Sequence, residues 1–129
     1  MMTFEELMLR LNEFVVDRNW SEFHTPKNLL MALSAEVGEL MEIFQWDNDQ
    51  SQMEKLNDPE MRAKIEGEFA DALLYLLHFA NATSIDVQAV AHTKLSENER
   101  RFTRERAREL SRDRFREHIL SRDGGFSGE

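Results

Sequence analysis

Apolar residues recur every three or four positions along most of this chain, which is the spacing of amphipathic helices. The first such stripe predicts a helix that begins with a capping box at Thr3 and runs to about Arg18. A second helix is predicted from Pro26 to about Trp46, with Thr25 as its N-cap. No stretch alternates between apolar and polar residues over the length of a β-strand.

Three further helices are predicted downstream. A polar connection over 47–58 leads to a third helix with Pro59 in its first turn. Ser84 is predicted to cap a fourth helix that ends near Phe102, and a highly charged fifth helix follows over about 104–120. On the second helix the expected inward positions are Leu30, Leu33, Val37, Leu40 and Phe44. On the third they are Ile65, Phe69, Ala72, Leu73, Leu76, Leu77 and Ala80. On the fourth they are Val87, Val90, Ala91, Leu95 and Phe102. The fold class predicted is therefore all-α, an antiparallel bundle of four core helices plus a charged C-terminal helix.

Length and composition place this bundle in one small domain. We expect the 129-residue chain to form a single helical domain over 1–120, followed by a disordered tail over 121–129 that carries three glycines. The chain has no cysteine, no visible secretory signal and no apolar run of transmembrane length, so we expect a cytoplasmic protein without a membrane partner. The net charge of −9 argues against binding nucleic acid through a basic surface.

Two pairs of carboxylates interrupt the apolar helical sequence. Glu36 and Glu39 lie three residues apart on the second helix, and Glu68 and Asp71 have the same spacing on the third. Residues three apart share one helix face, so two such helices packed together would gather four carboxylates. Solvated surface charges are the ordinary explanation for a single helical glutamate. Here the surrounding sequence is apolar, and like charges at that distance repel strongly unless a cation binds between them.

The types of ligand indicate a hard metal ion. Four carboxylates without cysteine or histidine favour Mg²⁺, with Mn²⁺ as the alternative. Di-iron bundles use Glu-x-x-His pairs, and none of the four histidines has a glutamate three residues before it. Because Mg²⁺ commonly binds a few carboxylates together with substrate phosphates, the cluster predicts a phosphorylated substrate.

Further motifs accompany the E-x-x-E pair within EVGEL and the later E-x-x-D pair: the segment 18–30 (RNWSEFHTPKNLL), FQW at 44–46, and Lys94 followed by Asn98. Together these motifs resemble the MazG-like nucleotide pyrophosphohydrolases, and among them most closely the dCTP pyrophosphatase branch. The resemblance covers about residues 12–102. It implies a helical dimer or dimer of dimers in which Glu36, Glu39, Glu68 and Asp71 bind Mg²⁺. It also implies cleavage of a nucleoside triphosphate between the α and β phosphates, giving the monophosphate and pyrophosphate.

The resemblance also assigns side chains to the substrate. Trp20 and Trp46 are implied for the nucleobase pocket, where aromatic stacking contributes roughly 1–3 kcal/mol per base in single-stranded nucleic-acid sites. They lie at opposite ends of one helix, so a pocket that uses both would cross a subunit interface. Lys94 and Asn98 are implied for polar contacts with phosphate, sugar or base. By their chemistry, His24 is a further candidate for the base or sugar, and Tyr75, one turn from Asp71, for the sugar or a phosphate. The alternative for each of these residues is a structural one, in packing, in the loop or on a solvated helix face.

The function predicted is that of an Mg²⁺-dependent nucleotide pyrophosphohydrolase acting on dCTP or a modified pyrimidine deoxynucleotide. The metal would lower the pKa of the attacking water, and Glu36 or Glu39 would accept its proton. Two alternatives stay open. One is a non-catalytic helical oligomer with a structural metal site, suggested by the charged segment 100–122. The other is a related all-α dUTPase or phosphoribosyl-ATP pyrophosphohydrolase. Base preference, the number of metal ions, and dimer versus homotetramer are left open by the sequence.

Overall fold

The structure is a computed structural model that describes residues 1–123, and every regular element in that range is an α-helix. This confirms the all-α prediction. The helices are α1 (Phe4–Asp17), α2 (Pro26–Phe44), α3 (Asp49–Asn57), α4 (Pro59–Thr83), α5 (Val87–Arg101) and α6 (Arg104–Asp123). The chain divides into two compact units, Met1–Val87 and Gln88–Glu129.

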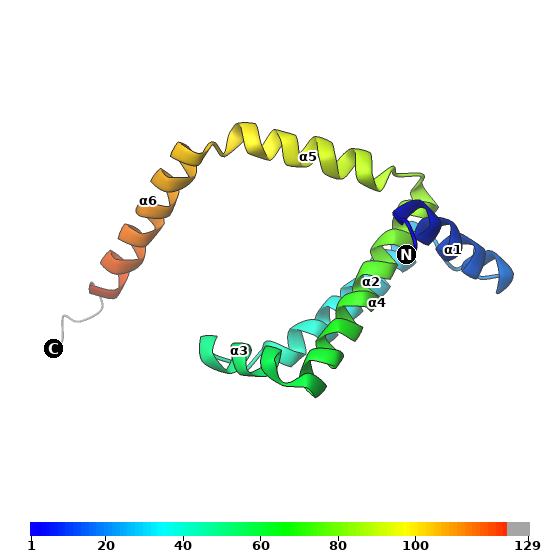
Figure 1. Cartoon of the computed structure of the whole chain (residues 1–129), viewed down its shortest axis with the longest axis horizontal. Coiled ribbons are helices and arrows are strands. Elements are labelled where there is room, and N and C mark those ends of the chain that lie inside the picture. The colour runs from blue at the N-terminus through cyan, green and yellow to red at the C-terminus, as the bar shows by residue number, and fades with distance from the viewer. Residues whose placement is uncertain (124–129) are drawn as a thin grey trace. The chain divides into compact units, whose positions relative to one another are not determined.

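The first unit is built around α4, which packs against α1, α2 and α3 (Figure 1). Its most extensive contact is with α2, and α3 connects the end of α2 to the start of α4. The two long helices therefore run antiparallel. Side chains from both helices at the same level along their axes can face each other, which decides where the acidic pairs lie.

The predicted helix starts are confirmed by their capping bonds. The Thr3 hydroxyl accepts from the Glu6 backbone N–H, and the Glu6 carboxylate accepts from the Thr3 backbone N–H at 2.7 Å. Thr25 caps α2, and Asp58 caps α4, where its carboxylate accepts from the backbone N–H of the third helical residue. A proline follows each of these two caps, at the position where a missing N–H costs no helical hydrogen bond.

The segment 47–58, predicted as a polar connection, contains the helix α3, so that prediction was wrong. A helix of nine residues without an apolar stripe gives no periodic signal, and its ends decide its stability. Asn48 and Ser51 form a capping box at its start. At its end the Lys55 ammonium contacts the Ile43 carbonyl oxygen and the Asp47 carboxylate, the latter at 2.6 Å, which fixes α3 to the last turn of α2.

Three smaller boundaries also differ from the prediction. Ser84 ends α4 in the left-handed conformation, with φ 57°, instead of capping the next helix. Its N–H bonds to carbonyls of the preceding turn, as a residue that closes a helix does. The helix α2 ends at Phe44, before Trp46, and α6 continues to Asp123, beyond the predicted end at Leu120. The rest of the predicted tail, 124–129, lies outside the described residues.

The buried core of the described chain is small and purely aliphatic. It consists of Leu11, Val15, Leu29, Ile43, Leu77 and Ala80. On α2 the buried residues are one position away from the predicted stripe, because the face that packs on α4 is turned toward Leu29 and Ile43. Part of the predicted stripe is therefore exposed, including Leu30 and Val37, and so are the predicted inward residues Phe69 on α4 and Leu95 on α5.

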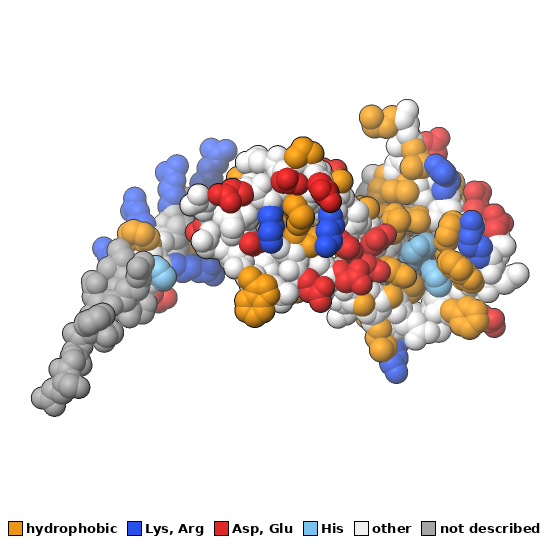
Figure 2. All heavy atoms as spheres, turned by 90° about the horizontal axis from the view of Figure 1, so that it is seen from below, with side chains coloured by type: hydrophobic (Ala, Val, Ile, Leu, Met, Phe, Trp, Pro, Cys, Tyr) orange, Lys and Arg blue, Asp and Glu red, His pale blue; other side chains and the backbone are white. Residues whose placement is uncertain are grey.

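Both long helices of the first unit thus carry a second apolar face that the unit leaves exposed. Figure 2 shows hydrophobic side chains, in orange, reaching the surface of the face that it presents. The exposed apolar residues on α2 and α4 are Leu30, Met31, Val37, Met41, Phe69, Leu73 and Leu76. Several large apolar side chains exposed on the same helices are typical of an interaction surface.

Truncating the most deeply buried side chain tests this core. Leu29 is 2 % exposed, so Leu29→Ala is expected to lower the free energy of unfolding by about 2–5 kcal/mol, through lost burial and a residual cavity. Leu9→Ala is the matched control, because Leu9 is 65 % exposed and its loss should cost no more than about 0.5 kcal/mol. Urea denaturation followed by circular dichroism measures both. Equal losses in the two variants would contradict the packing described here.

Candidate functional site

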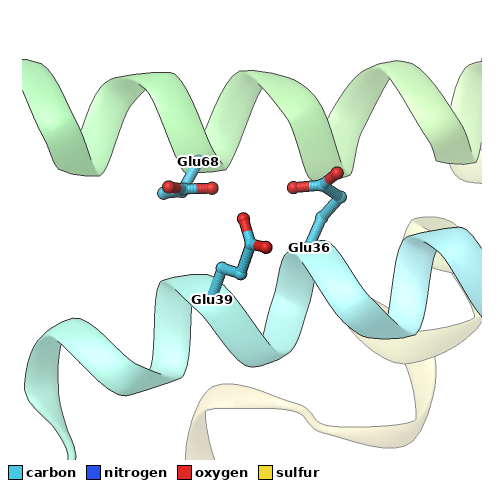
Figure 3. Close-up of side chains that lie close together, drawn as sticks. All are labelled: Glu36, Glu39 and Glu68. Atoms are coloured by element: carbon cyan, nitrogen blue, oxygen red, sulfur yellow. The ribbon is translucent and has the colours of Figure 1, made fainter.

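Three of the four predicted metal ligands meet between α2 and α4. Glu36 and Glu39 extend from α2 and Glu68 extends from α4, and their carboxylates point toward one another across the space between the helices (Figure 3). Each residue offers one carboxylate oxygen to a group whose members all lie within 4.8 Å of one another. The antiparallel packing of α2 and α4 brings together the oxygens of three of these acids, whereas the sequence predicted a cluster of four.

The fourth predicted ligand, Asp71, lies one turn beyond Glu68 on α4 and is exposed. Its charge still acts on the cluster, because it is among the carboxylates that raise the pKa of Glu36. Its oxygens are outside the group of three that converge. Direct ligation of a metal by Asp71 stays a prediction.

Electrostatics show that the cluster is under repulsion. Partial burial raises the pKa of Glu36 above its ordinary value, and the charges of Glu39, Asp71 and Glu68 raise it further. Burial likewise raises the pKa of Glu68, with the adjacent Glu39 carboxylate as the next cause. The residues present therefore fit a divalent cation, which would neutralise several carboxylates at once and accepts all-oxygen ligands.

A second group of side chains, which includes three predicted substrate residues, lies on the loop before α2 and on the last turns of α4. The Trp20 and His24 rings stack at 6.5 Å between centroids, with 27° between their planes. The His24 ring meets the His78 ring edge-on at 4.9 Å, and Tyr75 lies 6.2 Å from His78. The structure thus brings the predicted substrate residues Trp20, His24 and Tyr75 into one neighbourhood.

Sequence reasoning missed His78, which joins this group from α4. A signal was present, because Glu68, Asp71, Tyr75 and His78 follow one another at steps of three, four and three residues and so share a helix face. Burial, and secondarily the charge of His24, lowers the pKa of His78 below its ordinary value. The imidazole is therefore neutral at pH 7, with one N–H donor and one nitrogen acceptor.

The remaining predicted substrate residues are Trp46, Lys94 and Asn98. Trp46 follows the end of α2 and is 91 % exposed, whereas Trp20 precedes that helix and is 44 % exposed. Lys94 and Asn98 lie on α5, in the second unit, where Lys94 pairs with Glu97 at 3.5 Å on the surface. The approach of Trp46, Lys94 and Asn98 to the carboxylates stays a prediction.

Comparison with known proteins decides the family. The sequence model of the MazG-like family matches residues 31–114, more than half of the chain. This chain belongs to the MazG-like family. The match includes all four acidic residues, and it extends well into α6, past the segment at which the motif-based resemblance ended.

This MazG-like chain is similar to proteins named dCTP pyrophosphatase 1. It is 38% identical over 110 residues to dCTP pyrophosphatase 1 from Homo sapiens and 38% identical over 100 residues to the protein of that name from Bos taurus. The matches cover 85% and 78% of this chain but only 65% and 59% of those relatives, so the chain spans less than two thirds of their length.

A solved structure supports the same family and the fold. The crystal structure of a pyrophosphatase from Archaeoglobus fulgidus superimposes with a TM-score of 0.72 at 39% identity, covering 78% of this chain and 92% of that chain. The resemblance seen in the motifs is therefore confirmed. Among the described helices of this MazG-like chain, none has the length and apolar character needed to span a membrane.

Removing one charge from the cluster should stabilise the metal-free protein. The raised pKa values of Glu36 and Glu68 mean that the folded state binds protons more tightly than the unfolded state. Stability should therefore fall as the pH rises above about 4.5, the ordinary glutamate value. We expect Glu39→Gln to raise the melting temperature at pH 7 in the presence of a chelator, and to reduce this pH-dependent loss.

The same variant should lose most of the stabilisation by Mg²⁺, because one of the converging ligands is gone. Differential scanning calorimetry at several pH values, with chelator and with Mg²⁺, measures both effects. Glu13→Gln, an exposed residue of α1, is the control and should behave like the wild type. A Glu39→Gln protein that is less stable than wild type without metal would contradict the repulsion argument.

Proposed function

We propose that this chain is a metal-dependent nucleoside triphosphate pyrophosphohydrolase, which hydrolyses its substrate between the α and β phosphates. The observation that carries the proposal is the convergence of Glu36, Glu39 and Glu68 from two antiparallel helices, in a chain of the MazG-like family. The relatives named dCTP pyrophosphatase 1 and the pyrophosphatase from Archaeoglobus fulgidus support the reaction class.

The carboxylates have two tasks in this proposal. Glu36, Glu39, Glu68 and Asp71 would hold Mg²⁺, with Mn²⁺ as a substitute. When bound, the metal neutralises phosphate charge and lowers the pKa of the attacking water. A carboxylate oxygen of Glu36 or Glu39 accepts the water's proton.

The nucleoside is assigned to the region around Tyr75, His24 and Trp20. Asp71 and Tyr75 lie one turn apart, so a substrate whose phosphates bind at the acids can extend along the helix toward Tyr75, His24 and Trp20. Stacking on an indole ring favours a flat base over other groups. We propose dCTP or a modified pyrimidine deoxynucleotide as the substrate, on the strength of the relatives' names.

Assembly into a homodimer or homotetramer belongs to the proposal. The exposed apolar faces of α2 and α4 offer the surface, and Trp46, almost fully exposed at the end of α2, is available to the site of a second subunit. Lys94 and Asn98 on α5 are proposed to reach the phosphates and the sugar, since an ammonium group and an amide match those groups. We expect the hydrolysis reaction to take place in the cytoplasm, without nucleic-acid or membrane partners.

Loss of one cluster ligand tests the reaction. Glu68→Ala should lower the rate of pyrophosphate release by at least about 100-fold, more than is usual for residues that only orient metal ligands. Glu66→Ala, at an exposed position two residues earlier on α4, is the control and should keep its rate. Pyrophosphate is measured with dCTP and Mg²⁺ by ion chromatography, and circular dichroism verifies folding. Wild-type turnover in a folded Glu68→Ala protein would refute the assignment.

The identity of the products separates pyrophosphohydrolases from phosphatases. Incubation with a panel of canonical and modified nucleoside triphosphates should give pyrophosphate and the monophosphate, with pyrimidine deoxynucleotides consumed fastest. Chelation of the metal should stop the reaction, and Mg²⁺ should restore it. Release of inorganic phosphate in place of pyrophosphate would contradict the cleavage site.

A further inference from the structure

A small polar pocket lies within the first unit, beside the stacked rings of Trp20 and His24. Its volume is about 190 Å³, and its polar lining comes from Asn12 on α1, Ser21 and His24 on the following loop, and His78 and Asn81 on α4. None of the five was assigned to this pocket from the sequence, and only His24 was a predicted substrate residue. The pocket is smaller than the roughly 300–1,000 Å³ typical of sites that enclose a whole drug-sized ligand. It can therefore receive one ring edge, not an entire nucleotide.

The walls of this pocket are held in place by contacts of their own. The His78 ring packs edge-on against His24 at 4.9 Å, and Trp20 stacks on His24 at 6.5 Å. The Asn81 amide donates one N–H to the Met8 carbonyl oxygen at 3.1 Å, which anchors it to α1. A pocket with fixed polar groups can discriminate between ligands, because those groups do not have to be ordered on binding.

The pocket lies in line with the acidic cluster along α4. Glu68, Asp71, Tyr75 and His78 share one face of that helix, and His78 is seven residues beyond Asp71. At a rise of about 1.5 Å per residue, the two positions are roughly 10 Å apart along the axis. That separation is comparable with the reach of a nucleotide from its α-phosphate to the far edge of its base. Phosphates at the acids would place the base edge near the pocket.

We propose that this pocket binds the hydrogen-bonding edge of a pyrimidine base, and that His78 and Asn81 are specificity-determining residues for it. The inference rests on the proposed function for the position of the phosphates. A neutral imidazole and an amide each offer a donor and an acceptor, and the Ser21 hydroxyl does the same. A pyrimidine edge also presents both donors and acceptors, and its single ring needs less room in this small pocket than the two rings of a purine.

Equilibrium binding of product-like ligands tests the assignment of this pocket to the base without any hydrolysis. Titration calorimetry with dCMP and dAMP should show tighter binding of dCMP to the wild type. His78→Ala should weaken dCMP binding roughly 3- to 10-fold, the range expected for one lost hydrogen bond, and change dAMP binding less. His78→Gln keeps a donor and an acceptor and should recover part of the preference. His92→Ala, an exposed histidine of α5, is the control and should bind like the wild type.

Nuclear magnetic resonance of the histidine ring nitrogens separates contact from an indirect effect of repacking. Addition of dCMP to the wild type should shift the ring signals of His78 and His24 and leave those of His92 unchanged. An unchanged ratio of dCMP to dAMP affinity in His78→Ala, unshifted His78 signals, or no saturable dCMP binding at millimolar concentration would each overturn the inference.

These outcomes are distinguishable from failure of the proposed function. A protein that releases pyrophosphate but keeps its base preference in His78→Ala retains the proposed function and refutes the pocket assignment. A protein that binds dCMP through His78 but releases no pyrophosphate retains the pocket and refutes the reaction.

Discussion

Repulsion among carboxylates held between α2 and α4 is the constraint on which the site depends. Glu36, Glu39 and Glu68 bring oxygens within 4.8 Å of one another in a partly buried setting. A fold that only needed stability would place apolar residues there, because unpaired carboxylates near a core are costly. The aliphatic core around Leu29, Ile43 and Leu77 supplies the packing that holds the helices together against this repulsion.

The same two helices also leave apolar side chains exposed, and two of these, Met41 and Phe69, line one cavity between α2 and α4. Val37 and Met41 on α2, and Phe69 and Leu76 on α4, remain exposed in the first unit. A helix that is apolar on most sides is normally buried on most sides. The proposal of a second subunit, and of Trp46 serving its site, rests on these exposed apolar residues.

Much of the helical fold could be predicted from residues whose signals span only a few positions of the sequence. Thr3, Thr25 and Asp58 mark helix starts through capping bonds that span three residues. The i,i+3 acidic pairs predict a cluster as soon as two helices pack. The helix α3 could not be predicted in this way, because Lys55 stabilises it through contacts with Ile43 and Asp47, and such contacts exist only in the folded chain.

The choice of buried face is likewise a tertiary property. A helix with apolar residues on two sides contains two possible stripes, and the sequence favoured the one through Leu30 and Val37 where packing buries Leu29 and Ile43. His78 was missed for a related reason, since one histidine on an apolar helix usually belongs to the core. Its helical spacing was a signal, but its contact with His24, from a loop more than fifty residues away in sequence, exists only in the folded chain.

The central claim is that the three converging carboxylates form a divalent-metal site, and Mn²⁺ binding followed by electron paramagnetic resonance tests it most directly. The free-ion signal should fall on addition of the wild-type protein and return when excess Mg²⁺ competes. It should persist with the Glu36→Gln, Glu39→Gln, Glu68→Gln triple variant, whose folding is verified by circular dichroism. Equal Mn²⁺ binding by the folded triple variant and the wild type would contradict the account.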